Sequence, residues 1–258
     1  MKNQREEWFD AERKVAVTIV DVTGPAGELA RAHLCGPTSA YFLSRALAAA
    51  ALLGAEMSEP EESLILQMKC KGPLGGFNVE CTAAGTLRGY TERKTLDDFD
   101  GMGAPDVRKV VGERQLQVTR SVPGKILSQG VSNSLDGYLA GSLQRKAVIF
   151  TEATVTDEVE VLCARGVMVE ELPDGRDTGV FAVTPKSLAV ASRTLLSEFG
   201  LSRAELKRTT PLKFACRCSP ERALAALAAL SPAERETLPE TLDITCHMCG
   251  RTFSVPTR

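Results

Sequence analysis

The sequence predicts an α+β fold with three consecutive parts. We expect an N-terminal mixed α/β domain over residues 1–178, a helical linker over 179–211 and a small C-terminal module over 212–258. Two observations predict this division. Apolar residues in the first part form several period-two runs, typical of strands, around one long helical pattern. Four of the eight cysteines are paired near the C-terminus, whereas the other four are scattered.

The N-terminal unit begins with a predicted strand at residues 14–21, KVAVTIVD, which alternates and is rich in Val and Ile. Pro37 opens a helix that runs to about Met57, and its many alanines allow another element to approach closely. We therefore place this helix in the core. Further strands are predicted at residues 64–68, 76–81, 86–91, 114–120, 125–131, 148–153 and 159–170. Ser134 caps a helix predicted over 134–144.

The linker follows a turn predicted at residues 173–175, Pro-Asp-Gly. Residues 185–199 and 202–208 predict two short helices broken at Gly200. Their many small and polar residues indicate a modest core and hence low local stability.

Helix starts and short strands mark the C-terminal module. Ser219 precedes a proline at a first helical turn, and Ser231 with Glu234 forms a capping-box pattern. Residues 241–245 and 252–255 predict short strands on either side of the last cysteine pair.

The paired cysteines form the pattern C-x-C, then 27 residues, then C-x-x-C. The spacing fits a tetrahedral site for one zinc ion held by four thiolates. A module this short has too little core to fold without such a staple, so a purely structural zinc site remains an alternative at this point. The predicted ligands are Cys216, Cys218, Cys246 and Cys249.

Both cysteine pairs can also close as disulfides once the metal leaves. The C-x-x-C pair closes comfortably, whereas C-x-C closes a smaller and more strained ring. We therefore predict that Cys246 and Cys249 oxidise first, and Cys216 and Cys218 second. His247 lies between two ligands, and we expect it to be exposed because four sulfurs already fill the site.

Composition excludes several classes. The formal net charge is −2, and the longest apolar run, residues 46–53, is far shorter than the roughly 20 residues of a membrane-spanning helix. The charged N-terminus contains no signal sequence, so we expect a cytoplasmic protein. We expect the scattered thiols to be inert core residues. These thiols are Cys35, Cys70, Cys81 and Cys163. We expect His33, which precedes the first predicted helix, to be an ordinary loop or partly buried residue.

The segments CRCSPER (residues 216–222) and TCHMCG (245–250) resemble the zinc domain of the 33 kDa chaperonin family, which are redox-regulated heat-shock chaperones. Residues 43–57, 63–81 and 86–90 resemble the N-terminal domain of that family in order and spacing. The resemblance implies an ATP-independent holdase that is inactive while reduced and zinc-bound. It also implies that oxidation releases zinc, unfolds the module and linker, and exposes surface for unfolding clients.

Carried over to this chain, the resemblance assigns metal binding to Cys216, Cys218, Cys246 and Cys249. In the oxidised form it implies disulfides between Cys216 and Cys218 and between Cys246 and Cys249. It implies a non-enzymatic protein that is a homodimer when oxidised, with unfolded proteins as partners. The linker is shorter than is typical of the family, which leaves the activation threshold open.

Two other functions compete with this interpretation. A zinc ribbon that binds nucleic acid would need a basic stripe. Residues 211–258 instead carry six basic and five acidic side chains, a sum of +1, and four thiolates with one zinc ion add −2, giving −1. A thiol–disulfide enzyme would need the C-x-x-C motif to open a helix, but the segment after it predicts a strand.

Overall fold

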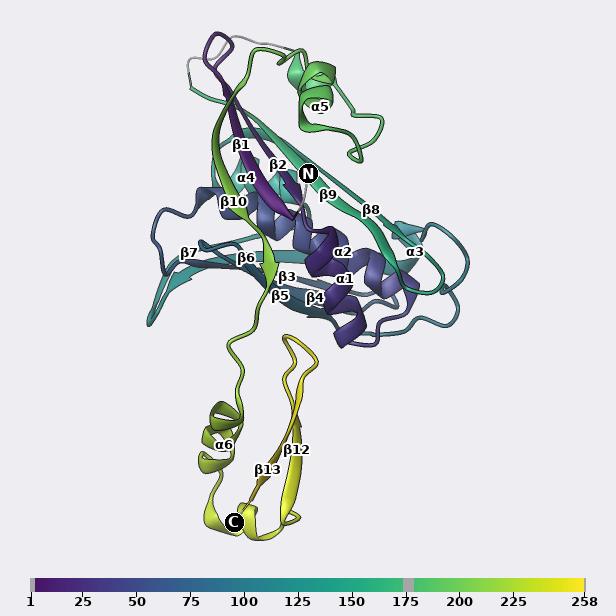
Figure 1. Ribbon diagram of the computed structural model, residues 1–258, viewed down its shortest axis with the longest axis vertical. Helices are drawn as coiled ribbons and strands as arrows, with labels where there is room; N and C mark the ends of the chain where they lie inside the picture. Colours follow the sequence, from purple (N-terminus) through teal and green to yellow (C-terminus); the bar gives the residue numbers. More distant parts are fainter. Residues whose placement is uncertain (1–2, 174–178, 258) are drawn as a thin grey trace.

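The computed structural model describes residues 3–173 and 179–257. Two sheets enclose a central helix in the N-terminal unit, and the C-terminal module lies below it (Figure 1). The five-stranded sheet is antiparallel throughout, in the order β10-β1-β2-β9-β8. Its strands are β1 (Gln4–Asp10), β2 (Val15–Asp21), β8 (Lys146–Val155), β9 (Val161–Glu171) and β10 (Glu205–Pro211).

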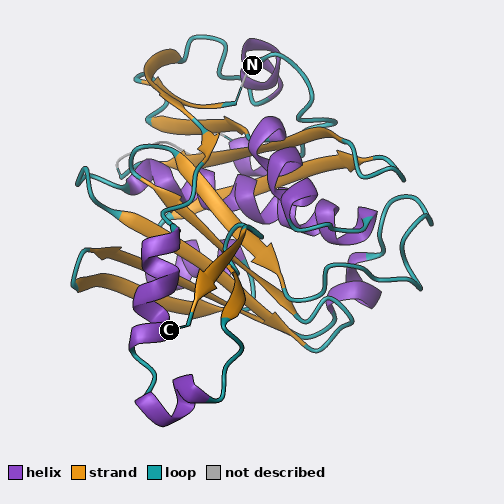
Figure 2. Cartoon of the chain, turned by 60° about the horizontal axis from the view of Figure 1, so that its bottom comes forward, coloured by secondary structure: helices purple, strands orange, loops and turns teal. Residues whose placement is uncertain are grey.

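The second sheet has six strands in the order β11-β5-β4-β3-β6-β7. Only its β11–β5 pair is parallel. Its strands are β3 (Ser63–Cys70), β4 (Gly76–Thr82), β5 (Thr86–Thr91), β6 (Arg114–Val122), β7 (Lys125–Ser132) and β11 (Lys213–Phe214). Strands make up most of the larger body, with helices beside and between them (Figure 2). The mixed helix-and-sheet fold expected from the sequence is confirmed, and each strand predicted in the N-terminal unit is present.

Helix α2 (Pro37–Leu53) is the core helix that the alanine-rich pattern predicts, and a short 3-10 turn, η1 (Gly54–Glu56), extends it. It contacts strands of both sheets, and Leu43, Leu47 and Leu52 are fully buried. The stretch Pro37–Glu56 is long and apolar enough to cross a membrane, but 83% of its apolar window is buried inside the protein. Its hydrophobicity therefore reflects a position between two sheets.

Three elements in the described part of the N-terminal unit escaped the sequence analysis. Strand β1 is rich in charged residues, and its pairing with β2 and β10 decides its conformation. Helix α1 (Thr23–Ala32) contains two glycines and a proline, which weaken a helical pattern. His33 therefore follows the first helix, as its C-cap, instead of preceding it, and it is buried. Helix α3 (Val107–Val111) is a single short turn capped by Asp106, while α4 (Leu135–Ser142) was predicted, with Ser134 as its cap.

The linker differs most from expectation. It contains a 3-10 turn, η2 (Val180–Ala182), and one α-helix, α5 (Ser192–Glu198), which lies within the first predicted helix. The helix predicted at residues 202–208 is wrong, because this stretch enters strand β10 and pairs with β1 along the edge of the five-stranded sheet. Tertiary pairing overrides a weak local preference here. The turn expected at residues 173–175 falls largely outside the described residues.

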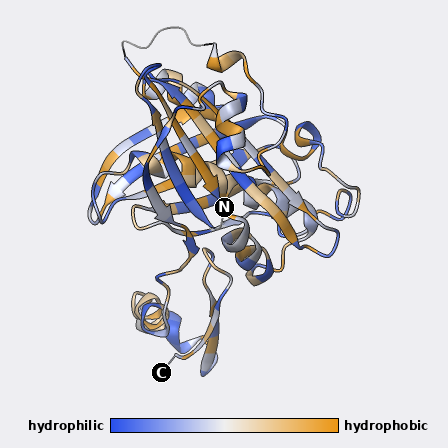
Figure 3. Cartoon of the chain, turned by 45° about the horizontal axis from the view of Figure 1, so that its top comes forward, coloured by the Kyte–Doolittle hydropathy of each residue, from blue (hydrophilic) through white to orange (hydrophobic). Residues whose placement is uncertain are grey.

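The C-terminal module has the predicted elements. Helices α6 (Pro220–Ala228) and α7 (Pro232–Glu236) carry the expected Ser219 cap and capping box. Strands β12 (Thr241–Thr245) and β13 (Thr252–Pro256) form an antiparallel hairpin. Hydrophobic residues occur in both the larger body and this module (Figure 3), but the module's buried apolar cluster is small and consists of Ala223, Leu227 and Val255. The division of the chain into three domains remains a prediction, since β10 and β11 pair with strands of the N-terminal unit.

Candidate metal centre

The two cysteine pairs are positioned by different local structures. Cys216 and Cys218 follow β11, which pairs with β5. Cys246 and Cys249 lie in the turn between β12 and β13. The Cys249 and Gly250 amides donate to the Cys246 carbonyl at 3.3 and 2.9 Å, and the Cys246 amide donates to the Arg251 carbonyl at 2.8 Å. Gly250 completes this turn with a φ of 73°, a left-handed conformation that suits glycine.

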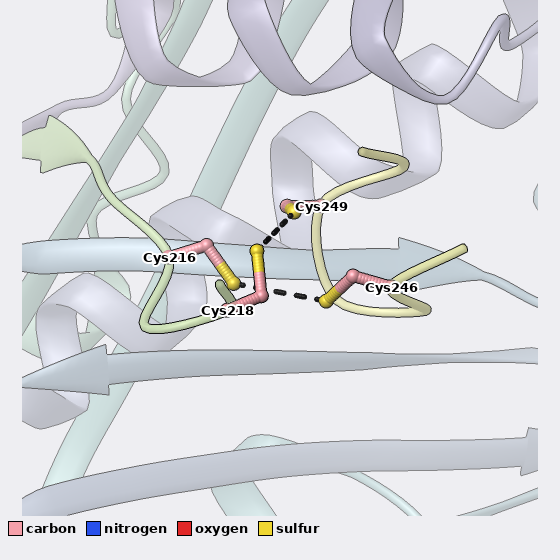
Figure 4. Close-up of side chains that lie close together, drawn as sticks. All are labelled: Cys216, Cys218, Cys246 and Cys249. Carbon is pink, nitrogen blue, oxygen red and sulfur yellow. Dashed lines mark hydrogen bonds between the residues drawn. The ribbon is translucent and has the colours of Figure 1, made fainter. Parts of the chain in front are cut away.

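The four predicted ligands converge on one point (Figure 4). All four sulfurs lie within 4.8 Å of one another. The Cys216–Cys246 and Cys218–Cys249 sulfur distances are 3.8 and 3.3 Å. Tetrahedral zinc with Zn–S bonds of about 2.3 Å would place its sulfurs about 3.8 Å apart. The arrangement is therefore of the right size for a tetrahedral ion, and the cluster can hold a metal.

The shortest sulfur contacts join the two sequence pairs to each other and do not run within a pair. In a tetrahedral cage every sulfur neighbours the other three, so proximity does not select a disulfide pattern. The predicted pairing and order of oxidation therefore stay predictions.

The thiols of the cluster differ in acidity. Burial raises the pKa of Cys216, but hydrogen bonds from Arg88, the Cys218 backbone and neighbouring thiols outweigh burial and lower the pKa to about 6. Burial is the main cause that raises the pKa of both Cys218 and Cys249. The neighbouring Cys216 raises the pKa of both thiols further, although a hydrogen bond with Cys249 partly lowers that of Cys218. Once one thiol of the cluster has ionised, its negative charge makes ionisation of the neighbouring thiols less favourable. A divalent cation would reverse this, because its charge stabilises all four thiolates.

The scattered thiols lie elsewhere. Cys35, Cys81 and Cys163 are buried and Cys70 is half-buried. Burial raises the pKa of Cys70, and it raises the pKa of each of the other three to about 11. Raised thiol pKa values suppress the reactive thiolate, as expected of inert cysteines. His247 is exposed, as predicted, and its ring meets that of Tyr90 edge-on at 5.7 Å.

Sequence reasoning missed one residue beside the cluster. The Arg88 side chain on β5 donates a hydrogen bond from Nη1 to the Cys216 sulfur at 3.5 Å. The two residues are 128 positions apart, and β5 carries no metal-site motif, so only the pairing of β11 with β5 reveals the contact.

Comparison with known proteins then decides the family. The family profile described as Hsp33 protein matches residues 7–256. The chain belongs to the Hsp33 family. Its relatives in this family include the 33 kDa chaperonin of Thermus thermophilus, which is 29% identical over 270 residues, covering 92% of this chain and 79% of the relative. The 33 kDa chaperonin of Symbiobacterium thermophilum is 30% identical over 250 residues, covering 88% and 85%.

A solved structure shares the fold. The 33 kDa chaperonin of Thermotoga maritima, an Hsp33 homologue, matches with a TM-score of 0.88 and 21% identity, covering 100% of this chain and 96% of its own. Membership of the Hsp33 family makes this chain a chaperone, and the family expected from the cysteine and N-terminal motifs is confirmed.

Proposed function

We propose that this protein is a cytoplasmic, ATP-independent holdase that a zinc-centred thiol switch controls. In the reduced state Cys216, Cys218, Cys246 and Cys249 hold one zinc ion and the protein rests. Under oxidative stress, peroxide takes two electrons from each cysteine pair and is reduced to water. Disulfides form between Cys216 and Cys218 and between Cys246 and Cys249, and zinc leaves. The active form, a homodimer, binds unfolding proteins and acts neither as an enzyme nor on nucleic acid.

The observation that carries the proposal is the convergence of all four sulfurs in one compact cage. The cage supplies a metal site and a set of oxidisable thiolates at once. When bound, zinc contributes charge neutralisation and a rigid tetrahedral anchor. Because a pair of thiolates cannot both hold the metal and share a disulfide bond, oxidation and metal binding exclude each other.

The linker supplies surface that such a switch can uncover. Its apolar residues pack on the outer face of the five-stranded sheet, against Trp8, Val17 and Val167 among others. The linker side of this cluster comprises Val180, Leu188, Leu195, Leu196, Phe199, Leu201 and Ala204. A linker that detaches would therefore expose two complementary apolar surfaces to an unfolding client.

A short segment of the chain connects the four cysteines to the linker. Strand β10 ends at Pro211, and Cys216 follows shortly after β11. Most residues of β10 are exposed, so its pairing with β1 is the main interaction that keeps it in the sheet. If the four-cysteine cluster came apart, the C-terminal end of β10 would lose its anchor, and the packing of the linker on the sheet would weaken.

The test follows zinc release and client aggregation in the same samples. Reduced protein should contain about one zinc per chain and give little protection to a thermally unfolding client. Peroxide-treated protein should release the zinc and suppress aggregation, with mass spectrometry showing the two neighbouring disulfides. Equal protection in both states would exclude the switch, and no bound metal in the reduced protein would exclude the zinc site.

A further inference from the structure

A buried carboxylate lies where the C-terminal module meets the six-stranded sheet. Glu80 on β4 has only 2% of its side chain exposed. It accepts a hydrogen bond from Arg88 Nε at 2.6 Å and one from Arg217 Nη2 at 2.6 Å. Arg88 belongs to β5, whereas Arg217 is the residue between Cys216 and Cys218. One carboxylate thus binds an arginine from the sheet and an arginine from the loop that carries Cys216 and Cys218.

The same arginines reach the cage. Arg88 donates to Glu80 and also to the Cys216 sulfur, so it bridges the carboxylate and the first predicted ligand. The connections form a closed loop from Cys216 through Arg88 and Glu80 to Arg217, which is the next residue in the chain after Cys216. A loop of charge-assisted hydrogen bonds fixes both position and orientation more firmly than one contact.

Backbone hydrogen bonds show that the two loops that carry the cysteine pairs both contact β5. The Gly89 amide on β5 donates to the Met248 carbonyl at 2.9 Å, and the Ala215 amide donates to the Leu87 carbonyl at 3.2 Å. Gly250 approaches helix α1 so closely that an added Cβ would lie 2.3 Å from the Ala32 carbonyl. The module therefore rests on β5 and the end of α1 through specific contacts.

We propose that Glu80, Arg88 and Arg217 form an electrostatic latch that docks the module on the six-stranded sheet and makes the cage retain its metal more strongly. The latch orders Cys216 and Cys218 in the folded position that a tetrahedral ion requires, so less ordering accompanies metal binding. By reciprocity, metal in the cage strengthens docking by the same factor. Zinc as the ion rests on the proposed function, whereas the latch rests on the contacts of these residues.

If the latch exists, replacing the exposed Arg217 side chain should strongly increase the rate of zinc loss. Arg217 has 59% of its side chain exposed, so Arg217→Ala should leave the fold intact. It removes one of two cations from a buried carboxylate, which is costly for the docked state. In reductant, with neither oxidant nor client, a chelating dye should remove zinc at least about fivefold faster from this variant than from the parent protein. Arg222→Ala, at an exposed arginine of the same module, is the matched control and should match the parent.

Three further measurements separate a latch from a general loss of stability. Glu80→Gln should also speed zinc loss. The double variant should be no faster than the faster single variant, because both changes remove the same Glu80–Arg217 ion pair. Hydrogen exchange of the Gly89 amide should rise in each variant while that of β3 stays unchanged. High salt should reduce the difference between parent and variant.

Zinc loss at the parental rate in both Arg217→Ala and Glu80→Gln would overturn the latch, as would strictly additive effects. Because the assay contains no oxidant, such a result would leave the redox switch standing. A protein that binds no zinc at all would instead remove the proposed function and the latch's role in metal retention together.

Discussion

The N-terminal unit and the C-terminal module reach stability by different routes. The unit buries helix α2 between two sheets, with leucines such as Leu43, Leu47 and Leu52 at 0% exposure. The module's buried apolar cluster consists of Ala223, Leu227 and Val255, with Leu238, Leu242, Ile244 and Phe253 packed partly buried against it. So small a core cannot offset the conformational entropy of ordering the module.

The difference teaches where a switch can be placed. Removing a metal bound at the four cysteines would change the N-terminal unit little, because apolar burial stabilises that unit. The module itself would then have few buried contacts to keep its fold. The linker lies between these extremes, since it has a real but shared core on the five-stranded sheet. The predictions below test this gradient from the largest expected effect to the smallest.

The largest effect should come from loss of a cage thiol. Cys249 is fully buried at the cage, and Cys249→Ser should abolish stable metal binding and unfold the module. Structural zinc contributes about 10–16 kcal/mol in zinc-finger peptides, far more than the module's core can replace. Zinc content should fall from about one per chain to near zero, and hydrogen exchange should show loss of protection confined to the module and the linker.

The scattered cysteine Cys70 provides the control for that change. Cys70→Ser alters a half-buried thiol in the N-terminal unit and should leave the zinc content unchanged. If Cys249→Ser kept a folded, protected module, the contrast between the two regions would be wrong.

The next effect should come from the core of the N-terminal unit. Leu47→Ala removes a fully buried side chain from α2 and should lower the free energy of unfolding by about 2–5 kcal/mol. Denaturant unfolding followed by circular dichroism measures this loss. Zinc content should not change, because the module does not depend on this core, and concerted loss of zinc would show that the two regions unfold as one.

A smaller change is expected in the linker. Leu195 on α5 is fully buried against the five-stranded sheet, and Leu195→Ala should destabilise the linker by about 2 kcal/mol, near the low end for such truncations because a surface element can relax. Under the proposed switch, this variant should protect clients at milder heat or less oxidant than the parent. Leu206→Ala, at a side chain 46% exposed on β10, is the control and should leave the threshold unchanged.

The smallest effect should come from a helix cap in the module. Ser219 accepts a hydrogen bond from the Arg222 amide, and Ser219→Ala should cost about 1 kcal/mol. While metal holds the module, we expect a slight rise in exchange of the first α6 amides with no change in zinc content. A complete loss of metal from so mild a change would mean that the cage has much less stability than the contrast implies.

Local patterns predicted much of this structure because they depend on neighbouring residues. The strand patterns predicted β2 to β9, and the alanine-rich stretch predicted α2. Ser219 and Ser231 marked the starts of α6 and α7. The fourfold cysteine pattern likewise predicted a cage, because tight turns place each pair and tetrahedral chemistry limits the spacing.

Tertiary structure alone decided the rest. Residues 205–211 have a composition that suits helix or strand, and pairing with β1 made them an edge strand. Glu80 and Arg88 carry no motif, yet the pairing of β4 with β5 and of β5 with β11 brings them to Cys216 and Arg217. The sequence by itself indicated which sulfur atoms could bind a metal, since ligand chemistry is local. Only the folded chain decided what holds the four-cysteine cluster in place, since such contacts join residues far apart in sequence.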